Sequence, residues 1–294
     1  MSFIHPNRVT KSNPSQYVLT IVAVLAAYVF VGQVPLAIGW SLAEYQSADL
    51  IATMQENYGL TTTLFILIFP LLMVFVALLV SVKFVHKWKL LSIFNNRSKI
   101  DFKRIALSFF VWFAISMLIM VYGFNEEFQW NFQAEKFFPL AVLSLLIIPI
   151  QCAAEELLFR GYLFQAFGTK IKQGWIVVIL SGVLFGTLHM SNPEFDQLGN
   201  IALIYYVWSG FFLGFLTLLD DGLELPLGYH MANNLFATLI VTNDWQAFTT
   251  DALYVDQNPP SFTLEMMVIL VIGQLVFAGL FSKLYRWKFN TLKK

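Results

Sequence analysis

Six polar side chains that could support hydrolytic chemistry lie inside long apolar stretches of this 294-residue chain. They are Glu155, Glu156, Arg160, His189, His230 and Asn234. An ionisable side chain inside a membrane-length apolar stretch costs about 2.5–3.5 kcal/mol even on a lenient scale, so such residues usually have a function. Their clustering in three stretches, 153–160, 185–189 and 230–234, indicates one candidate active site.

The spacing of the charged residues in the first stretch predicts two different roles for its carboxylates. Glu156 and Arg160 are four residues apart, so on a helix they share a face and form an ion pair. Glu155 points about 100° away around the same helix and stays free to act on a substrate. Burial favours the neutral form of a carboxylic acid, which makes proton exchange near pH 7 feasible.

The remaining polar residues provide the other groups that peptide-bond hydrolysis needs. Glu155 could activate a water molecule with help from His189. His230 and Asn234, again four residues apart, could donate hydrogen bonds to a developing oxyanion. In the purely structural alternative these side chains are only helix contacts, and all six would then have to gather at one depth by chance.

Membrane helices must position these residues, because the composition excludes most other classes of protein. Hydrophobic residues make up 58% of the chain and charged residues 12%, about half the fraction of a soluble domain. With no net charge, the chain is neither disordered nor fibrous nor suited to binding nucleic acid. We expect an all-α, polytopic integral membrane protein with about eight helices, at 17–39, 62–82, 105–124, 137–167, 175–190, 201–219, 225–241 and 263–285.

The basic residues predict the orientation of this bundle. All but two of the 18 Lys and Arg residues fall at one end of an eight-helix arrangement, and acidic residues dominate the other end. The positive-inside rule makes the basic end cytoplasmic and places both chain termini there, most simply in the cell membrane. Asp220 and Asp221, at a turn on the basic side, are expected to be solvated, and His86 in a basic loop is assigned no role.

Helix geometry tests whether the polar residues could meet. The fourth and fifth helices form a hairpin that closes near residue 172, which puts Glu155 and His189 at nearly the same depth, roughly 20–25 Å from the turn. Asn234 lies about 20 Å from the turn after the sixth helix, and His230 is one helical turn shallower. The residues therefore share a layer if the three helices are neighbours.

Three motifs together resemble those of the CAAX-prenyl-protease and bacteriocin-processing (CPBP, or Abi) family of intramembrane proteases. They are Glu155-Glu156-x-x-x-Arg160, Phe185-x-x-x-His189 and His230-x-x-x-Asn234. Each motif alone is weak, but the three occur in that family's order and on the expected helices. The resemblance covers a catalytic core of about residues 140–240 within a single transmembrane domain, 1–294.

The resemblance implies a fold whose eight helices enclose a polar intramembrane cavity. It also implies an endopeptidase that acts in or at the membrane on a membrane-associated peptide or protein, of the prenylated or leader type. It implies the lipid bilayer and such a substrate as partners, and no nucleic acid. The roles it implies are water activation by Glu155 with His189, oxyanion stabilisation by His230 and Asn234, and support of the site by Glu156 with Arg160.

Metal dependence is open at this point. Members of the family are often described as metalloproteases, although a metal-free glutamate mechanism is also argued for them. Zinc or another divalent metal would be held here by Glu155, His189 and His230, a ligand set that suits catalytic zinc. No cofactor is certain, and we slightly favour the mechanism without a metal.

Two other functions compete with proteolysis. A non-catalytic membrane binding protein or bacteriocin self-immunity factor could use the same polar pocket. A proton-coupled transporter also needs buried Glu and His side chains. The sequence shows neither paired half-helices nor related halves, which disfavours the transporter.

Overall fold

The computed structural model describes residues 3–4, 12–45 and 47–289, and it is mainly helical. The helices are α1 (Pro14–Ala26), α2 (Val34–Leu42), α3 (Leu50–Val80), α4 (Phe102–Gly123), α5 (Ala134–Glu156), α6 (Phe164–Gly168), α7 (Gly174–Leu188), α8 (Glu194–Leu198), α9 (Asn200–Asp220), α10 (Glu224–Leu239) and α11 (Leu264–Tyr285). Short π or 3-10 segments extend or join them: η2 (Ala27–Val31), η3 (Ser81–Val85), η4 (Leu90–Ile93) and η5 (Leu157–Leu163). The all-α expectation is confirmed.

Six helical stretches in the described part of the chain are long and apolar enough to cross a membrane, as expected for an integral membrane protein. They are Pro14–Leu42, Leu50–Val85, Phe102–Gly123, Ala134–Gly168, Asn200–Asp220 and Leu264–Tyr285. The expected fifth and seventh spans correspond to α7 and α10, which have only 15 and 16 residues. At 1.5 Å per residue α7 is about 22 Å long, shorter than the ~30 Å hydrocarbon core. These two short helices carry His189 at the end of α7 and His230 with Asn234 in α10.

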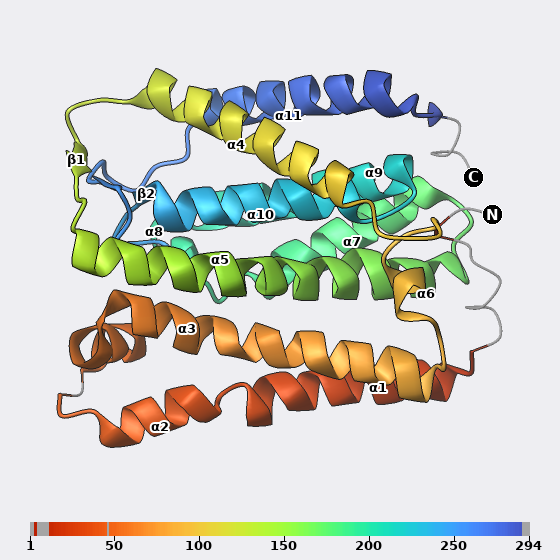
Figure 1. Cartoon of the computed structure of the whole chain (residues 1–294), viewed down its shortest axis with the longest axis horizontal. Helices are drawn as coiled ribbons and strands as arrows, with labels where there is room; N and C mark the ends of the chain where they lie inside the picture. The colour runs from red at the N-terminus through yellow and green to blue at the C-terminus, as the bar shows by residue number, and fades with distance from the viewer. Residues whose placement is uncertain (1–2, 5–11, 46, 290–294) are drawn as a thin grey trace.

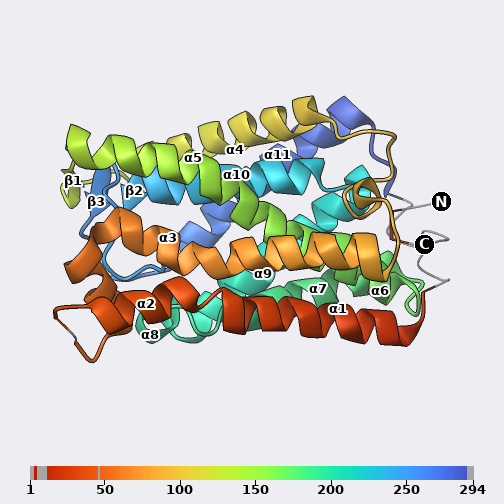
Figure 2. The same cartoon turned by 60° about the horizontal axis from the view of Figure 1, so that its bottom comes forward.

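The long helices lie side by side, and their two ends differ (Figure 1). Helix α1 begins and α11 ends at the end of the bundle where α6 lies, which we call the α6 end. Helix α8 lies toward the opposite end, together with β1 (Phe128–Trp130), β2 (Val241–Thr242) and β3 (Tyr254–Asp256), and we call this the sheet end (Figure 2). Of the basic residues used for orientation, Arg8, Lys11, Lys293 and Lys294 lie outside the described residues.

A three-stranded sheet closes the sheet end, where the sequence indicated only loops. The strand order is β1-β3-β2, with β1 antiparallel and β2 parallel to β3. Phe128 pairs with Asp256, which ties the segment before α5 to the segment before α11. These strands are too short and too far apart in sequence to give a recognisable alternating pattern.

Glycines bring α7 and α9 into close contact. A Cβ on Gly182 would lie 2.8 Å from the backbone nitrogen of Phe211, and one on Gly210 would lie 2.9 Å from the Cα of Gly182. No larger residue fits without separating the helices, as in other small-residue helix contacts. Helix α10 packs against both α4 and α5, so the motif-bearing α5, α7 and α10 surround one interior region together with α9.

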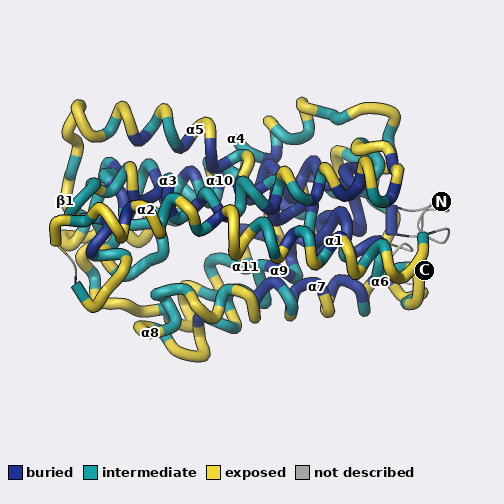
Figure 3. The backbone as a smooth tube through the Cα atoms, turned by 90° about the horizontal axis from the view of Figure 1, so that it is seen from below, coloured by how far each residue is buried: buried dark blue, intermediate teal, exposed yellow. Residues whose placement is uncertain are grey.

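Burial changes along α10 at the depth of the motifs. Every residue from Glu224 to His230 is buried, whereas Met231, Asn233 and Asn234 are partly accessible. Figure 3 shows the same trend for the whole bundle, with buried segments in its interior and more accessible backbone toward the sheet end. His230 therefore lies where the sealed part of the bundle gives way to a more open part.

Candidate active site

The two adjacent carboxylates lie at the junction between α5 and the π-helical segment η5. Glu155 and Glu156 are the last two residues of α5, and Arg160 follows within η5. Such π-helical turns are rare and are often found at functional sites. The expected ion pair between Glu156 and Arg160 is present, with 3.0 Å between Oε1 and Nη1.

Glu156 is the central acceptor of the site. Its Oε1 atom also accepts a hydrogen bond from His230 Nδ1 at 2.8 Å, which joins α5 to α10. Arg160 Nη2 donates to the Gly210 carbonyl of α9 at 3.1 Å, and its guanidinium lies 4.3 Å from the centre of the Phe185 ring. Both Glu156 and Arg160 are fully buried, so the pair is held without solvent.

Glu155 is held by only one of its two oxygens. Gln151 Nε2 donates to Glu155 Oε1 at 2.6 Å. Glu155 Oε2 is buried and has no hydrogen-bond partner among the residues that the structure describes. It lies 3.7 Å from His230 Nε2, too far for a direct hydrogen bond. Glu155 Oε2 therefore faces His230 Nε2 and accepts no hydrogen bond from the described residues.

Gln151 is a residue of this site that the sequence reasoning missed. Its Oε1 atom accepts a hydrogen bond from Asn234 Nδ2 at 2.9 Å, while its Nε2 atom is bound to Glu155. It therefore links the motif of α10 to the motif of α5. The available signal was its position four residues before Glu155, which puts both side chains on one face of the helix.

His189 does not contact the other candidate residues. It follows directly after α7, and its Nδ1 atom lies 2.7 Å from the Phe185 carbonyl. A carbonyl only accepts, so Nδ1 carries the proton and Nε2 of the neutral ring is an acceptor. The imidazole lies between two aromatic rings: it stacks on Tyr206, with centroids 4.4 Å apart, and contacts the tilted ring of Phe185, with centroids 4.3 Å apart. Phe185 also contacts His230, at 6.3 Å, and so lies against both histidines.

The three side chains named as metal ligands are not assembled as a ligand set. No group of three or more His, Cys, Asp or Glu side chains suited to a metal occurs among residues 3–4, 12–45 and 47–289. Glu155 and His230 face each other, but His189 is bound through Nδ1 to the Phe185 carbonyl of α7 and packs against the Phe185 ring. We therefore assign no step of the chemistry to a metal.

Comparison with known proteins identifies the segment that carries this geometry. Residues 135–236 match the family described as type II CAAX prenyl endopeptidase Rce1-like. We call this stretch the Rce1-like domain, after the family to which it is similar. The match begins at the start of α5, ends within α10, and includes all six candidate residues, in agreement with the resemblance to the CPBP family.

A curated relative extends the likeness beyond the Rce1-like domain. The chain is 33% identical over 166 residues to the uncharacterized protein YyaK of Bacillus subtilis (strain 168). This stretch covers 55% of the chain and 56% of that relative, so the likeness spans about half the length of each. No solved structure matches the chain.

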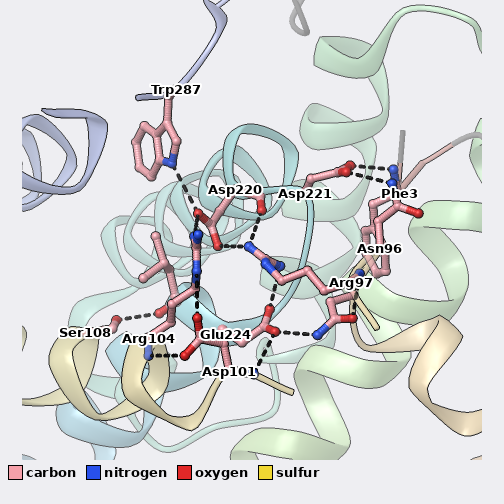
Figure 4. Close-up of polar contacts among 12 residues, drawn as sticks. Phe3, Asn96, Arg97, Asp101, Arg104, Ser108, Asp220, Asp221, Glu224 and Trp287 are labelled. Atoms are coloured by element: carbon pink, nitrogen blue, oxygen red, sulfur yellow. Dashed lines mark hydrogen bonds and ion pairs between the residues drawn. The ribbon is translucent and has the colours of Figure 1, made fainter. Parts of the chain in front are cut away.

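A second buried polar cluster joins the Rce1-like domain to the loop before α4 (Figure 4). Arg97 Nη2 lies 2.6 Å from Asp220 Oδ2, and Arg97 Nη1 lies 3.0 Å from Glu224 Oε2. Arg104 also pairs with Asp220, and Asn95 Nδ2 donates to Glu224 Oε1. We call these five residues the α6-end cluster.

The α6-end cluster corrects one expectation from the sequence. Asp220 was expected to be solvated, but it is buried, because two arginines from a distant segment and the indole Nε1 of Trp287 bind it. Asp221 accepts hydrogen bonds from the Phe3 backbone N–H at 2.5 Å and from Asn96 Nδ2 at 2.8 Å. Neither aspartate is therefore a free loop charge.

His86 likewise has a structural place that its sequence context did not indicate. It is buried directly after η3, and its Nε2 atom lies 2.9 Å from the Tyr162 hydroxyl and 3.1 Å from the Thr20 hydroxyl. Its ring also packs at 4.3 Å against the ring of Trp88. His86 thus connects α1 and η3 to the η5 segment of the Rce1-like domain.

Proposed function

We propose that the chain is an intramembrane endopeptidase that hydrolyses a peptide bond in a membrane-associated substrate of the prenylated or leader type. The observation that carries this proposal is the buried, unpartnered Glu155 Oε2, which faces His230 Nε2 at 3.7 Å. Leaving a buried acceptor unsatisfied costs about 1–3 kcal/mol, which a purely structural role would not require. A bound water that donates to Glu155 would satisfy it.

The charge balance of the cluster supplies a transferable proton. When Glu155 and Glu156 are both ionised, the guanidinium of Arg160 balances only one of them. An uncompensated charge in a low-dielectric interior is costly. One further proton, shared between Glu155 and His230, removes that cost. A proton that can reside on either group is what general acid–base catalysis requires.

In the proposed reaction, Glu155 Oε2 removes a proton from water while the water oxygen bonds to the substrate carbonyl carbon. The carbonyl oxygen becomes an oxyanion, for which Asn234 Nδ2 and the protonated His230 ring are the donors. The C–N bond then breaks, and the proton held by Glu155 passes to the leaving amine. Glu156 orients His230 through Nδ1 and stabilises its positive charge.

The proposed part of His189 in water activation requires a movement of Phe185. With Nδ1 bound to the Phe185 carbonyl, His189 has only Nε2 available as a base. The Phe185 ring packs against His189 and also contacts the guanidinium of Arg160. Rotation of this ring as the peptide enters would allow His189 and Glu155 to act on one water.

We place the protein in the cell membrane with the α6 end and both termini in the cytoplasm. The described basic residues of the connecting segments lie in the loop 86–104, the α6–α7 turn and the residues after α11, all at the α6 end. Basic loops stay on the cytoplasmic side. Reporter fusions after residue 289 that are active only in the periplasm or outside the cell would contradict this orientation.

The test of the proposed function is cleavage of a membrane-peptide library by the purified protein in lipid nanodiscs. Wild type, Glu155→Gln and His189→Ala are compared, each with and without a chelator. Glu135→Gln, an exposed glutamate at the start of the same helix, serves as the matched control. We expect cleavage by wild type and by the control, and none by the other two variants.

The same experiment separates the alternatives. Cleavage that persists in both Glu155→Gln and His189→Ala would contradict the proposal. Cleavage lost on chelation and restored by zinc would add a metal to the mechanism. If wild type cleaves nothing and Glu155→Gln also keeps the cellular phenotype, the binding or self-immunity role replaces the protease.

A further inference from the structure

Glu155, the carboxylate on which the proposed function rests, lies at the end of a hydrogen-bonded chain of three side-chain amides. Asn233 Nδ2 lies 3.3 Å from Asn234 Oδ1, and Asn234 Nδ2 lies 2.9 Å from Gln151 Oε1. Gln151 Nε2 then donates to Glu155 Oε1 at 2.6 Å. Every hydrogen bond in this series has its donor on the Asn233 side, so the whole chain points toward the carboxylate.

The amide chain determines which way Gln151 faces. A primary amide that rotates by half a turn exchanges its N–H donors for its carbonyl acceptor. If Gln151 turned over, its oxygen would face the Glu155 carboxylate and its nitrogen would face the Asn234 amide nitrogen. Both hydrogen bonds would be lost at a residue that is only 3% exposed. The hydrogen bond from Asn234 therefore keeps Gln151 in the orientation in which its Nε2 atom donates to Glu155.

Aligned hydrogen bonds strengthen each other in a low-dielectric interior. The hydrogen bond from Gln151 Nε2 also holds the Glu155 carboxylate in one orientation. Because Gln151 occupies Oε1, only Oε2 of Glu155 faces His230 and remains available. The chain thus selects which of the two oxygens can react.

We propose that Gln151 and Asn233 are positioning residues for Glu155, acting in series through Asn234. This inference rests on the proposed hydrolytic function. Gln151 acts directly, by orienting the carboxylate, and Asn233 acts only through the amides that follow it. Neither residue needs to contact the substrate, so their removal should slow the chemical step and leave substrate binding unchanged.

The test uses Gln151→Met, which keeps the side-chain length and removes the amide, together with Asn233→Ala and the double variant. Gln165→Met is the matched control, because Gln165 is a fully buried glutamine in α6 that donates to the Ser92 carbonyl at 3.1 Å. We expect Gln151→Met to lower kcat about 10- to 100-fold, the effect of losing a hydrogen bond to a charged group, with KM within about twofold. Asn233→Ala should lower kcat only about two- to fivefold, because it acts through cooperativity.

The double variant decides whether the residues act in series. If they do, it should be no slower than Gln151→Met alone, because the effect of Asn233 has no other route to Glu155. If the losses in kcat of the two single variants multiply in the double variant, the residues do not act in series and the inference is wrong. An unchanged kcat in Gln151→Met, or an equal loss in Gln165→Met, would overturn the role of Gln151.

An infrared measurement keeps the inference testable without any cleavage assay. Isotope-edited spectra of the carboxylate stretch, with Glu155→Gln to assign the band, report directly on the hydrogen bonding of Glu155. We expect Gln151→Met to shift this band and Gln165→Met to leave it in place. A band that does not move overturns the inference, whereas a wild type that cleaves nothing overturns only the proposed function.

Discussion

The α6-end cluster and the cluster around Glu155 contain the same kinds of residues but differ in how completely their carboxylates are partnered. Both oxygens of Asp220 are bound, by Arg97, Arg104 and Trp287. Both oxygens of Glu224 are bound as well, by Arg97, Asn95 and the Asp101 backbone N–H. In the other cluster, Glu155 and Glu156 each retain one buried oxygen without a partner among the described residues.

This difference separates a structural role from a chemical one. Buried polar groups in native proteins are almost always satisfied, so a saturated cluster needs no further explanation than holding segments together. The cluster around Glu155 shares helix α10 with the saturated cluster, through His230 and Glu224. Its unpartnered oxygens keep a cost that packing alone does not justify. The α6-end cluster therefore serves as an internal reference for the proposed active site.

The largest effect should come from Glu155→Gln, which changes the carboxylate to which we assign the chemical role. We expect cleavage to fall about 10²- to 10⁴-fold, the usual contribution of a general base, because an amide cannot accept the proton. The melting temperature in nanodiscs should change little, because glutamine keeps the length of the side chain and its carbonyl oxygen can still accept the hydrogen bond from Gln151. The corresponding variant in the α6-end cluster, Glu224→Gln, should lower the melting temperature and keep the activity of the folded protein. If Glu224→Gln instead lost activity and Glu155→Gln lost stability, the structural and chemical roles would be reversed.

Glu156→Gln should affect both properties, because Glu156 serves the pair with Arg160 and the bond to His230. Removing its charge leaves the guanidinium buried without its adjacent counter-ion, which costs about 3–5 kcal/mol of unfolding free energy. Cleavage by the remaining folded protein should fall about 10²-fold, as the stabilisation of protonated His230 is lost. Chemical denaturation and single-turnover cleavage measure the two effects separately, and a change in only one of them would contradict this dual role.

Arg97→Met should affect stability alone. It leaves Asp220 and Glu224 short of a buried partner, so we expect a loss of about 3 kcal/mol, at the low end for a broken buried pair because Arg97 is partly accessible. Thermal unfolding in nanodiscs gives the loss, with the exposed Lys99→Met in the same loop as control. Cleavage per folded molecule should stay within about twofold of wild type, and a large loss would mean that the α6-end cluster also shapes the site.

The smallest effect on stability should come from His86, whose ring forms hydrogen bonds with Thr20 and Tyr162 at the α6 end. Burial lowers the pKa of His86 below its usual value of 6.5. The folded state thus favours the neutral ring, and its contribution to stability is present above pH 6.5 and is lost as the pH falls through the lowered pKa. Melting temperatures between pH 8 and 5 should decline less in His86→Gln than in wild type. Parallel curves would contradict this prediction, because they would mean that the pKa of His86 is the same in the folded and unfolded states.

The sequence was sufficient to predict the depth of the site but not its contacts. Rise per residue along a helix is constant, so the gathering of Glu155 and His230 at one level follows from counting residues. Rotation about the helix axis is less predictable, because the π-helical segment η5 changes the helical repeat directly after Glu156. The spacing of four residues was enough to predict the pair with Arg160. The contact of the Phe185 ring with both histidines depends on how α7 packs and was not predictable.

Contacts between distant segments could not be predicted at all. Arg97 and Asp220 are 123 positions apart, and their pairing depends on how the loop before α4 folds over the α9–α10 turn. From the sequence alone, a charged residue at a turn is more simply explained by solvation. Gln151 differs, because its spacing from Glu155 was visible and only its neutral side chain hid its importance.

The shortness of α7 has a consequence for the lipid around the protein. A helix of 15 residues, with Ile179, Leu180 and Val183 exposed on its surface, is about 8 Å shorter than the ~30 Å hydrocarbon core beside it. Bilayers adapt to such hydrophobic mismatch by thinning locally. The leaflet next to the end of α7 is therefore expected to be depressed toward His189. A peptide anchored in that leaflet could then reach the depth of the proposed active site while most of it stays among the lipid chains. Cleavage should therefore slow as the lipid chains of the nanodisc are lengthened.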